Sequence, residues 1–243
     1  PSLQYGTIRF SKTIFKNSQL ITISDGFQNW LVKYSKNTNI EKFYLSYEKK
    51  QISKTKKFKD LEIKDGDFII SFVGNFSEIK FNFSFIFDCS NEIYSLSKNI
   101  KFVFCGDFKN LEEKNKYNFK NIFFYDWIDR DELRKLLNIS NLGLAPYNDL
   151  WDFNLSIPNK ISEYLCYELP ILTSLKGDTE NLINQYNCGI SYSSNEKNQF
   201  IQIIKNLYFD KEMYAKIKKG AIKASSKFYD DEVLRDMEKN ILN

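Results

Sequence analysis

The chain contains no histidine, and its four cysteines never form a C-x-x-C pair. A zinc site would have to be assembled from carboxylates and isolated thiols, which is an unusual ligand set for that metal. Cys89, Cys105, Cys166 and Cys188 each lie in or beside an apolar segment, so we expect small buried side chains. This use of cysteine favours a reducing, cytoplasmic setting. We expect neither a metal site nor a resident cofactor.

Long apolar runs are also missing. No segment approaches the roughly 20 apolar residues that a helix needs to cross a bilayer. The first residues lack the charged-then-apolar order of a signal sequence. Because the chain begins at Pro1 and not at Met, this second absence excludes less than the first.

Arginine is scarce, with four residues against a Lys+Arg total of 35 and a formal net charge of +4. Nucleic-acid binders commonly use arginine for bidentate contacts to bases and phosphates. Here lysines are scattered and acids are interleaved with them, so we expect no nucleic-acid partner. A lysine-rich face could rest on the anionic inner surface of a membrane. A soluble protein that is merely rich in lysine would show the same composition.

The 243 residues, 42% of them hydrophobic, suffice for one large or two small domains. Short apolar runs rich in β-branched and aromatic residues alternate with amphipathic stretches. The runs are 67–74, 100–106, 122–125, 142–145, 170–173 and 189–192. The helical stretches are 131–138, 159–167 and 178–186, followed by 196–209, 211–227 and 231–242. This order predicts a Rossmann-like, doubly wound parallel sheet of the α/β class, with the C-terminal helices covering it.

Residues 1–65 differ from the rest. We expect a strand at 18–24, a helix capped by Ser24 or Asp25, a second short strand at 43–45 and a lysine-rich surface linker at 55–64. One such unit is too small to bury a sheet of its own. We therefore predict a remnant of a larger domain plus linker at 1–65, and a Rossmann-like domain at 66–243.

The stretch 156–174 carries the most chemistry. Pro158 stands near the start of a predicted helix, where its missing N–H is harmless, and Asn159 follows it. Lys160 and Glu163 lie three apart and share one face at the end whose free N–H groups attract phosphate. A carboxylate one turn deeper can accept hydrogen bonds from a ribose diol. The combination suggests a nucleotide, although such a pair is more often a solvated surface pair.

Several segments in this order resemble a known family. They are 21–27 (ITISDGF), 70–76 (ISFVGNF), 102–106 (FVFCG), 141–147 (NLGLAPY), 158–164 (PNKISEY), 168–173 (ELPILT) and 187–190 (NCGI). The run from residue 18 to the end is similar to the last βα unit and the carboxy-terminal domain of GT-B-type retaining glycosyltransferases, the "group 1" family (family four).

The resemblance implies a domain that grips a nucleotide-sugar donor such as a UDP- or GDP-sugar. Glu163 matches the second glutamate of the family's paired-glutamate motif, which holds the ribose hydroxyls, and Lys160 would neutralise the diphosphate. Gly74 and Asn75 match the glycine turn that passes close to the phosphates, although Gly74 alone could simply end a strand.

The base would lie near Trp127 and Ile128, after the third strand of the domain. For Trp127, packing in the core is an equal alternative. The implied reaction is transfer of a sugar, with retention, to a cell-surface glycan or lipid-linked acceptor, at the inner face of the membrane.

Three departures open an alternative. The position of the family's first glutamate is Leu155, for which Asp152 could substitute unless it is only a loop carboxylate. The glycine loop carries Asn75, Phe76 and Ser77 in place of cations, with Lys80 the nearest one. By the resemblance, we expect these 243 residues to include little of the acceptor-binding domain. A catalytically silent module that binds a nucleotide or a protein therefore stays open.

Overall fold

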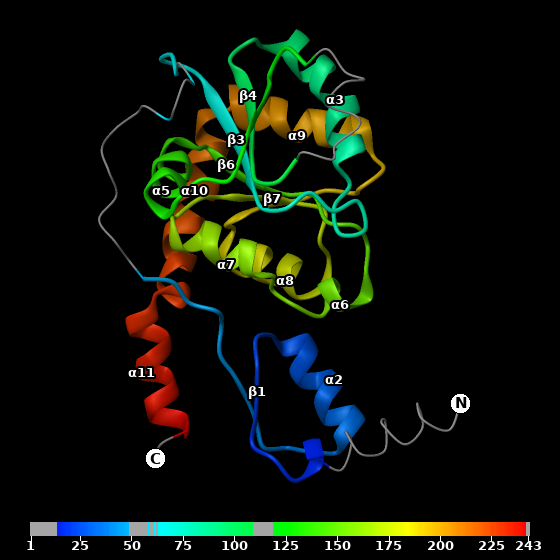
Figure 1. Cartoon of the computed structure of the whole chain (residues 1–243), viewed down its shortest axis with the longest axis vertical. Helices are drawn as coiled ribbons and strands as arrows, with labels where there is room; N and C mark the ends of the chain where they lie inside the picture. Colours follow the sequence, from blue (N-terminus) through cyan, green and yellow to red (C-terminus); the bar gives the residue numbers. More distant parts are fainter. Residues whose placement is uncertain (1–13, 49–57, 59–60, 62, 109–118, 242–243) are drawn as a thin grey trace.

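The large sheet is parallel throughout. The computed structural model describes residues 14–48, 58, 61, 63–108 and 119–241. The strands of this sheet are β3 (Phe68–Val73), β4 (Ile100–Cys105), β5 (Ile122–Tyr125), β6 (Leu142–Ala145), β7 (Ile171–Thr173) and β8 (Gly189–Ser191). They lie in the spatial order β5-β4-β3-β6-β7-β8, and every pair is parallel. This is the doubly wound order, so the predicted Rossmann-like α/β sheet is confirmed (Figure 1).

Helices cover both faces of this sheet (Figure 1). They are α3 (Phe83–Leu96), α5 (Arg130–Ile139), α6 (Trp151–Asn154), α7 (Asn159–Cys166), α8 (Gly177–Tyr186), α9 (Lys197–Phe209) and α10 (Lys211–Ser225). All six residues of β3 are buried. Ile70 and Phe72 pack into the cluster that contains residues of α3, whereas Ile69 and Val73 pack into the cluster that contains residues of α5. Burial on both faces explains why this strand is a continuous apolar run.

A small lobe, residues 14–48, lies below the large sheet in Figure 1. Its strands β1 (Leu20–Thr22) and β2 (Ile40–Lys42) pair in parallel, and α2 (Asp25–Ser35) connects them. The Ser24 hydroxyl caps α2 by accepting from Phe27 N–H, 3.3 Å away, as predicted. The predicted strand at 43–45 is wrong. β2 ends at Lys42, although Phe43 N–H still donates to the Thr22 carbonyl at 2.9 Å.

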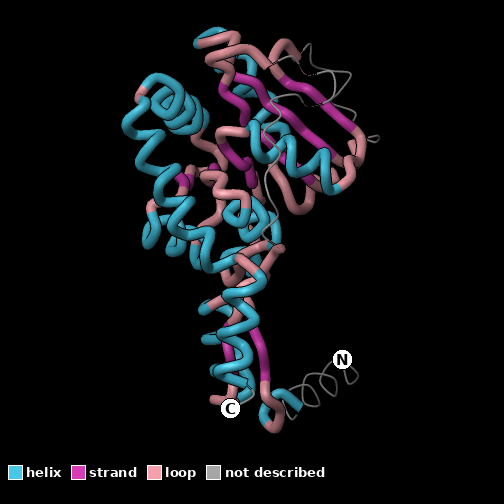
Figure 2. The backbone as a smooth tube through the Cα atoms, turned by 90° about the vertical axis from the view of Figure 1, so that its left-hand side faces the viewer, coloured by secondary structure: helices cyan, strands magenta, loops and turns pink. Residues whose placement is uncertain are grey.

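The C-terminal helices divide between the two sheets. α9 and α10 pack against the large one, as expected. After the short 3₁₀ turn η1 (Ser226–Phe228), α11 (Asp230–Ile241) departs and lies beside the small lobe, as Figures 1 and 2 show. The expectation that all three helices cover the large sheet is therefore wrong for α11. The chain passes between the small lobe and the large one twice, after β2 and after η1. These two connecting segments meet where Tyr47 N–H donates to the Phe228 carbonyl at 2.9 Å. The domain division at residue 65 stays a prediction.

Part of the predicted surface linker is buried. Most of residues 55–64 lie outside the described chain, but Phe58 and Leu61 have only 0% and 4% of their surface exposed. Phe58 packs edge-on against Tyr125, with 5.1 Å between ring centroids. The prediction of a surface linker is wrong for these two residues. The many lysines around them in the sequence hide the signal of two apolar side chains that are buried in the core. The predicted burial of all four cysteines is confirmed. No helix in the described segments is long and apolar enough to span a bilayer.

Candidate active site

The centre of the large sheet is a point where the strand order reverses. β3 and β6 are neighbours in space, although β4 and β5 intervene in the chain. The connections leaving their carboxyl ends run to opposite sides, which opens a crevice between them. The loop after β3 begins at Gly74, and the loop after β6 begins at Pro146.

A pocket of about 530 Å³ occupies this crevice. It is lined by Ile23, Phe27, Gly74, Asn75, Ser77, Lys80, Phe81, Tyr147, Asp152, Phe153, Ser156, Pro158, Asn159 and Lys160. The volume lies within the usual range for small-molecule sites. We call it the crevice pocket. Six of the predicted site residues share it: Gly74, Asn75, Asp152, Pro158, Asn159 and Lys160.

Lys160 is held at the carboxyl end of β3. Its ammonium donates to the Val73 carbonyl and lies 4.1 Å from the centroid of the Phe72 ring. Burial lowers the pKa of Lys160 to about 8, although the Glu163 carboxylate acts in the opposite direction. No ion pair joins the side chains of Lys160 and Glu163 in the described structure. The alternative of a solvated surface pair is therefore wrong for Lys160.

Gly74 leaves space for that ammonium. Its φ of +146° is a conformation that other residues rarely adopt, and a Cβ there would lie 2.8 Å from Lys160 Nζ. Gly106, at the equivalent end of β4, lies against the backbone of Gly74. A Cβ on Gly106 would overlap the Gly74 carbonyl oxygen, at 1.9 Å. The turn ends a strand, as the simpler alternative held, and it also makes room for a cation.

The amino end of α7 faces the same pocket. Pro158 is the N-cap residue and provides no side-chain cap. Within the described chain, the N–H groups of Asn159 and Lys160 have no hydrogen-bond partner. Tyr164 anchors the helix from behind, since its buried hydroxyl donates to the Leu144 carbonyl at 3.2 Å and accepts from Val73 N–H at 3.3 Å. Free N–H groups and the helix dipole make this end attractive to an anion.

Glu163 stands one turn deeper and does not line the crevice pocket. Its half-buried carboxylate makes no hydrogen bond within the described residues. Burial raises the pKa of Glu163, and the charges of Lys160 and Arg130 oppose that rise. An unsatisfied carboxylate near the pocket is compatible with the predicted diol contact, which stays a prediction.

Trp127 and Ile128 lie farther away, beyond the carboxyl end of β5 and outside the pocket lining. With 60% of its surface exposed, Trp127 is not a core residue, so that alternative is wrong. Ile128 is partly buried against the cluster that holds Leu136 and Leu137 of α5. Because β5 is two strands from β3, roughly 10 Å separates the two strand ends. The role of both residues in holding a base stays a prediction.

The residue at the expected position of the first glutamate joins the two lobes. The Leu155 carbonyl accepts hydrogen bonds from Phe27 N–H, at 3.1 Å, and from the Ser24 hydroxyl. Close by, Gly26 N–H donates to the Asp178 carboxylate at 2.5 Å. Asp152, on α6, lines the pocket and is partly exposed, so a carboxylate is available there.

Sequence reasoning missed several lining residues, most of them aromatic: Ile23, Phe27, Phe81, Tyr147, Phe153 and Ser156. Tyr147 could have been found, because it follows a predicted strand at the edge where ligands bind. Ile23 and Phe27 could not, since they come from the small lobe and no local pattern reports contact between lobes.

Comparison with known proteins identifies a family and a shared fold. The family model described as "Glycosyl transferases group 1" matches residues 53–224. No curated protein sequence matches the chain significantly.

Solved structures share the fold. HepE of Anabaena, crystallised with UDP and glucose, gives a TM-score of 0.73 at 14% identity, over 98% of this chain and 67% of its own. Sucrose-phosphate synthase of Thermosynechococcus elongatus gives 0.72 at 13% identity, over 97% and 60%. WaaG, a glycosyltransferase involved in lipopolysaccharide biosynthesis, gives 0.65 at 15% identity, over 93% and 63%. The chain thus spans roughly two thirds or less of these proteins' lengths.

Proposed function

Because the chain belongs to the group 1 glycosyl transferases, we propose that its crevice pocket holds a nucleotide-sugar donor and that the protein transfers the sugar to a glycan acceptor with retention. The donor class is supported by a structural neighbour, HepE, that was crystallised with UDP-glucose. UDP- and GDP-sugars both satisfy the chemistry argued below.

One observation carries the proposal: an ammonium, a helix amino end and a glycine turn converge at the point where the strand order reverses. The diphosphate would lie between Gly74 and the first turn of α7. As the bond from the sugar C1 to oxygen breaks, negative charge grows on the diphosphate. Lys160 and the free N–H groups of α7 stabilise that charge more than the ground state, which lowers the barrier.

The remaining parts of the donor have candidate contacts. Glu163 would accept hydrogen bonds from the ribose diol, since its carboxylate has unused acceptor capacity. The exposed indole of Trp127 would stack against the base, with Ile128 beside it. Asp152 would act on the sugar side of the pocket, near the position that Leu155 leaves without a carboxylate.

The acceptor and the location are proposed from a structural neighbour and from the composition. A cell-surface glycan or lipid-linked acceptor, handled at the cytoplasmic face of a membrane, is in keeping with the neighbour WaaG, which is involved in lipopolysaccharide biosynthesis. The lysine-rich composition would favour contact with anionic lipid headgroups.

A second function is favoured by Leu155. Without a carboxylate at that position, the fold could hold a nucleotide or a protein and catalyse nothing. Incubation with UDP-glucose and GDP-mannose, followed by chromatography of the nucleotides, separates the two functions. Release of free nucleoside diphosphate, UDP or GDP, supports the transferase, whereas tight binding without any turnover supports the silent module.

The proposal is tested by titration calorimetry with UDP, GDP and ADP. We expect one of them to bind, and Lys160→Ala to weaken that binding and to slow turnover by roughly tenfold to a thousandfold, the scale of losing one charge-stabilising group. Lys205→Ala removes an exposed lysine of α9 outside the pocket and serves as the control. Equal affinity in wild type and Lys160→Ala would show that Lys160 does not contact the diphosphate.

A further inference from the structure

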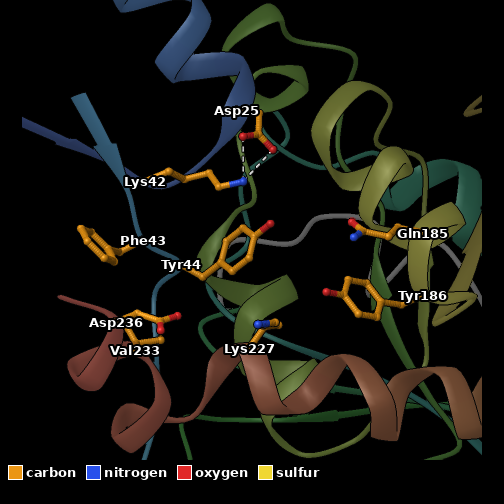
Figure 3. A pocket seen from close by; sticks show the side chains of 9 residues that line it. All are labelled: Asp25, Lys42, Phe43, Tyr44, Gln185, Tyr186, Lys227, Val233 and Asp236. Atoms are coloured by element: carbon orange, nitrogen blue, oxygen red, sulfur yellow. Dashed lines mark hydrogen bonds and ion pairs between the residues drawn. The ribbon is translucent and has the colours of Figure 1, made fainter. Parts of the chain in front are cut away.

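A second pocket, of about 390 Å³, lies between the small lobe and the large one. We call it the interlobe pocket (Figure 3). It is lined by Asp25, Lys42, Phe43, Tyr44, Gln185, Tyr186, Lys227, Val233 and Asp236. These residues come from α2, the end of β2 and the two residues that follow it, the last turn of α8, η1 and α11. The wall of the pocket therefore combines the small lobe, the large lobe and α11.

The floor of the interlobe pocket is firmly packed. Phe43 and Val233 are each 8% exposed. The Tyr44 ring stacks on Phe228, with centroids 5.0 Å apart, and Tyr186 packs against the main core. Above them, Lys42 Nζ donates to both carboxylate oxygens of Asp25, at 2.7 and 2.8 Å (Figure 3). Rigid aromatic walls therefore present polar tips at defined positions.

Several of the polar side-chain ends that line the interlobe pocket have unused hydrogen-bonding capacity. Figure 3 shows the hydroxyls of Tyr44 and Tyr186 and the amide of Gln185 directed into the space between the lobes. Within the described chain, Tyr186, Gln185 and Lys227 make no side-chain hydrogen bond or ion pair. Burial raises the pKa of Tyr44, and the charge of Lys42, which also hydrogen-bonds to the Tyr44 hydroxyl, opposes that rise.

The charges in the pocket balance. Asp25 and Asp236 carry negative charge, and Lys42 and Lys227 carry positive charge, so the four cancel at neutral pH. A strongly anionic ligand such as a free phosphate would meet two carboxylates as well as two ammoniums. A neutral ligand rich in hydroxyls matches the lining better, because each hydroxyl can both donate and accept. The tyrosine rings supply apolar surface for its carbon–hydrogen faces.

We propose that the interlobe pocket binds a neutral saccharide unit, at a site separate from the crevice pocket. The two pockets lie on opposite sides of the turn that begins α2: Ile23 and Phe27 line the crevice pocket, whereas Asp25 lines the interlobe one. A saccharide bound there touches the small lobe through Tyr44 and the large lobe through Tyr186. The inference uses no donor chemistry, so it stands or fails independently of the proposed transfer.

The experiment is saturation-transfer NMR on the full chain with glucose, galactose, N-acetylglucosamine and mannose, each as the free sugar and as an oligosaccharide. We expect at least one neutral saccharide to receive saturation, and a large excess of UDP to leave that signal in place. A stronger signal from the oligosaccharide identifies a unit of a glycan chain as the ligand, and an equal signal identifies a free sugar.

Conservative variants locate the site. Tyr186→Phe keeps the ring and removes only the hydroxyl, and Gln185→Ala removes the amide. Each should weaken binding, and together they should do so roughly tenfold or more, the effect of losing hydrogen bonds to an uncharged partner. Tyr94→Phe on α3 and Gln202→Ala on α9 are the matched controls and should change nothing. Thermal melting checks that each variant folds.

The proposal is overturned by any of three results. They are no saturation of any neutral sugar, full competition by UDP, and tighter binding of glucose 6-phosphate or inorganic phosphate than of glucose. If Tyr186→Phe fails to fold, wild-type protein with ¹³C-labelled tyrosine replaces it. Sugar-dependent shifts must then appear among the ring signals of the wild type, and they must be weaker in Tyr44→Phe, which lacks one of the two hydroxyls. Signals that do not move would also overturn the site.

Discussion

The ammonium of Lys160 lies in a half-buried position against an aromatic ring, and burial lowers its pKa to about 8. A bound diphosphate favours the charged form and raises that pKa again. Above about pH 7 the phosphate itself is fully ionised, so changes in affinity report on the lysine. We expect UDP affinity to be highest below pH 8 and to fall as the pH rises through 8. Calorimetry from pH 6.5 to 9.5 measures this.

Lys160→Met provides the control for this titration. It should bind weakly at every pH, with a flat profile above pH 7. The stability of the unliganded protein should change in the opposite sense. The unfolded chain holds the proton up to about pH 10.4, so between pH 8 and that value the unfolded state binds more protons and the wild type gains stability as pH rises. A wild-type affinity that stays constant across pH 8 would contradict the assignment.

Gly74 tests whether the turn serves the cation. Gly74→Ala should cost about 1–3 kcal/mol of stability for the strained backbone, and it should also displace Lys160 Nζ and reduce UDP binding. Gly66→Ala is the matched control. Its φ of +91° imposes similar strain, but the nearest atom to its Cβ would be the amide nitrogen of Asn99 at 3.8 Å. If both variants lose equal stability and both keep UDP affinity, Gly74 has only a structural role.

At the scale of elements, the N-cap of α2 has two tasks. Ser24 caps its own helix and donates to Leu155 in the other lobe. We expect Ser24→Ala to lower stability by about 1 kcal/mol, the usual value of a cap, and to speed hydrogen exchange at Gly26 and Phe27. Asp210→Ala, which removes the cap of α10, should cost a similar amount and leave that exchange unchanged. Equal exchange in both variants would mean that the lobes are not joined at Ser24.

The elements that sequence predicts well are those with a strong local pattern. β3 and β4 are continuous apolar runs because both of their faces are covered, and α5 lies within one residue of its predicted bounds at each end. The predicted position of β2 is displaced by three residues, because a strand of only three residues has no periodic pattern to detect. α3 and α6 were not predicted. The aromatic face of α3 resembles a strand as much as a helix, and α6 has only four residues.

At the scale of the whole molecule, the contact between lobes depends on a residue without a side chain. A Cβ on Gly26 would lie 2.8 Å from the Leu155 carbonyl oxygen and 2.9 Å from its Cα. Gly26→Ala should therefore separate the lobes, increase the radius of gyration in small-angle scattering and weaken UDP binding, because Ile23 and Phe27 leave the crevice. Ala215→Val, on the exposed side of α10, is the control. An unchanged scattering curve would show that the contact tolerates a methyl group.

The site divides in the same way between local and long-range information. Lys160 and Gly74 were predictable because strand-end loops and helix starts have local signatures, and the parallel order brings them to one edge. The contributions of Phe27 and Leu155 were not, since they depend on how two sheets meet. The lobes also exchange elements: α11 follows the large sheet in sequence but lies beside the small one.

The buried cysteines have a practical consequence. Because all four native thiols are buried, maleimide dyes should not react with them in the folded protein. Cysteines introduced on the surface would then be the sites that are labelled. One dye at position 33, on α2, and another at position 205, on α9, would report the distance between the lobes by energy transfer, molecule by molecule. Any change in that distance could then be followed in real time while sugars and nucleotides are added.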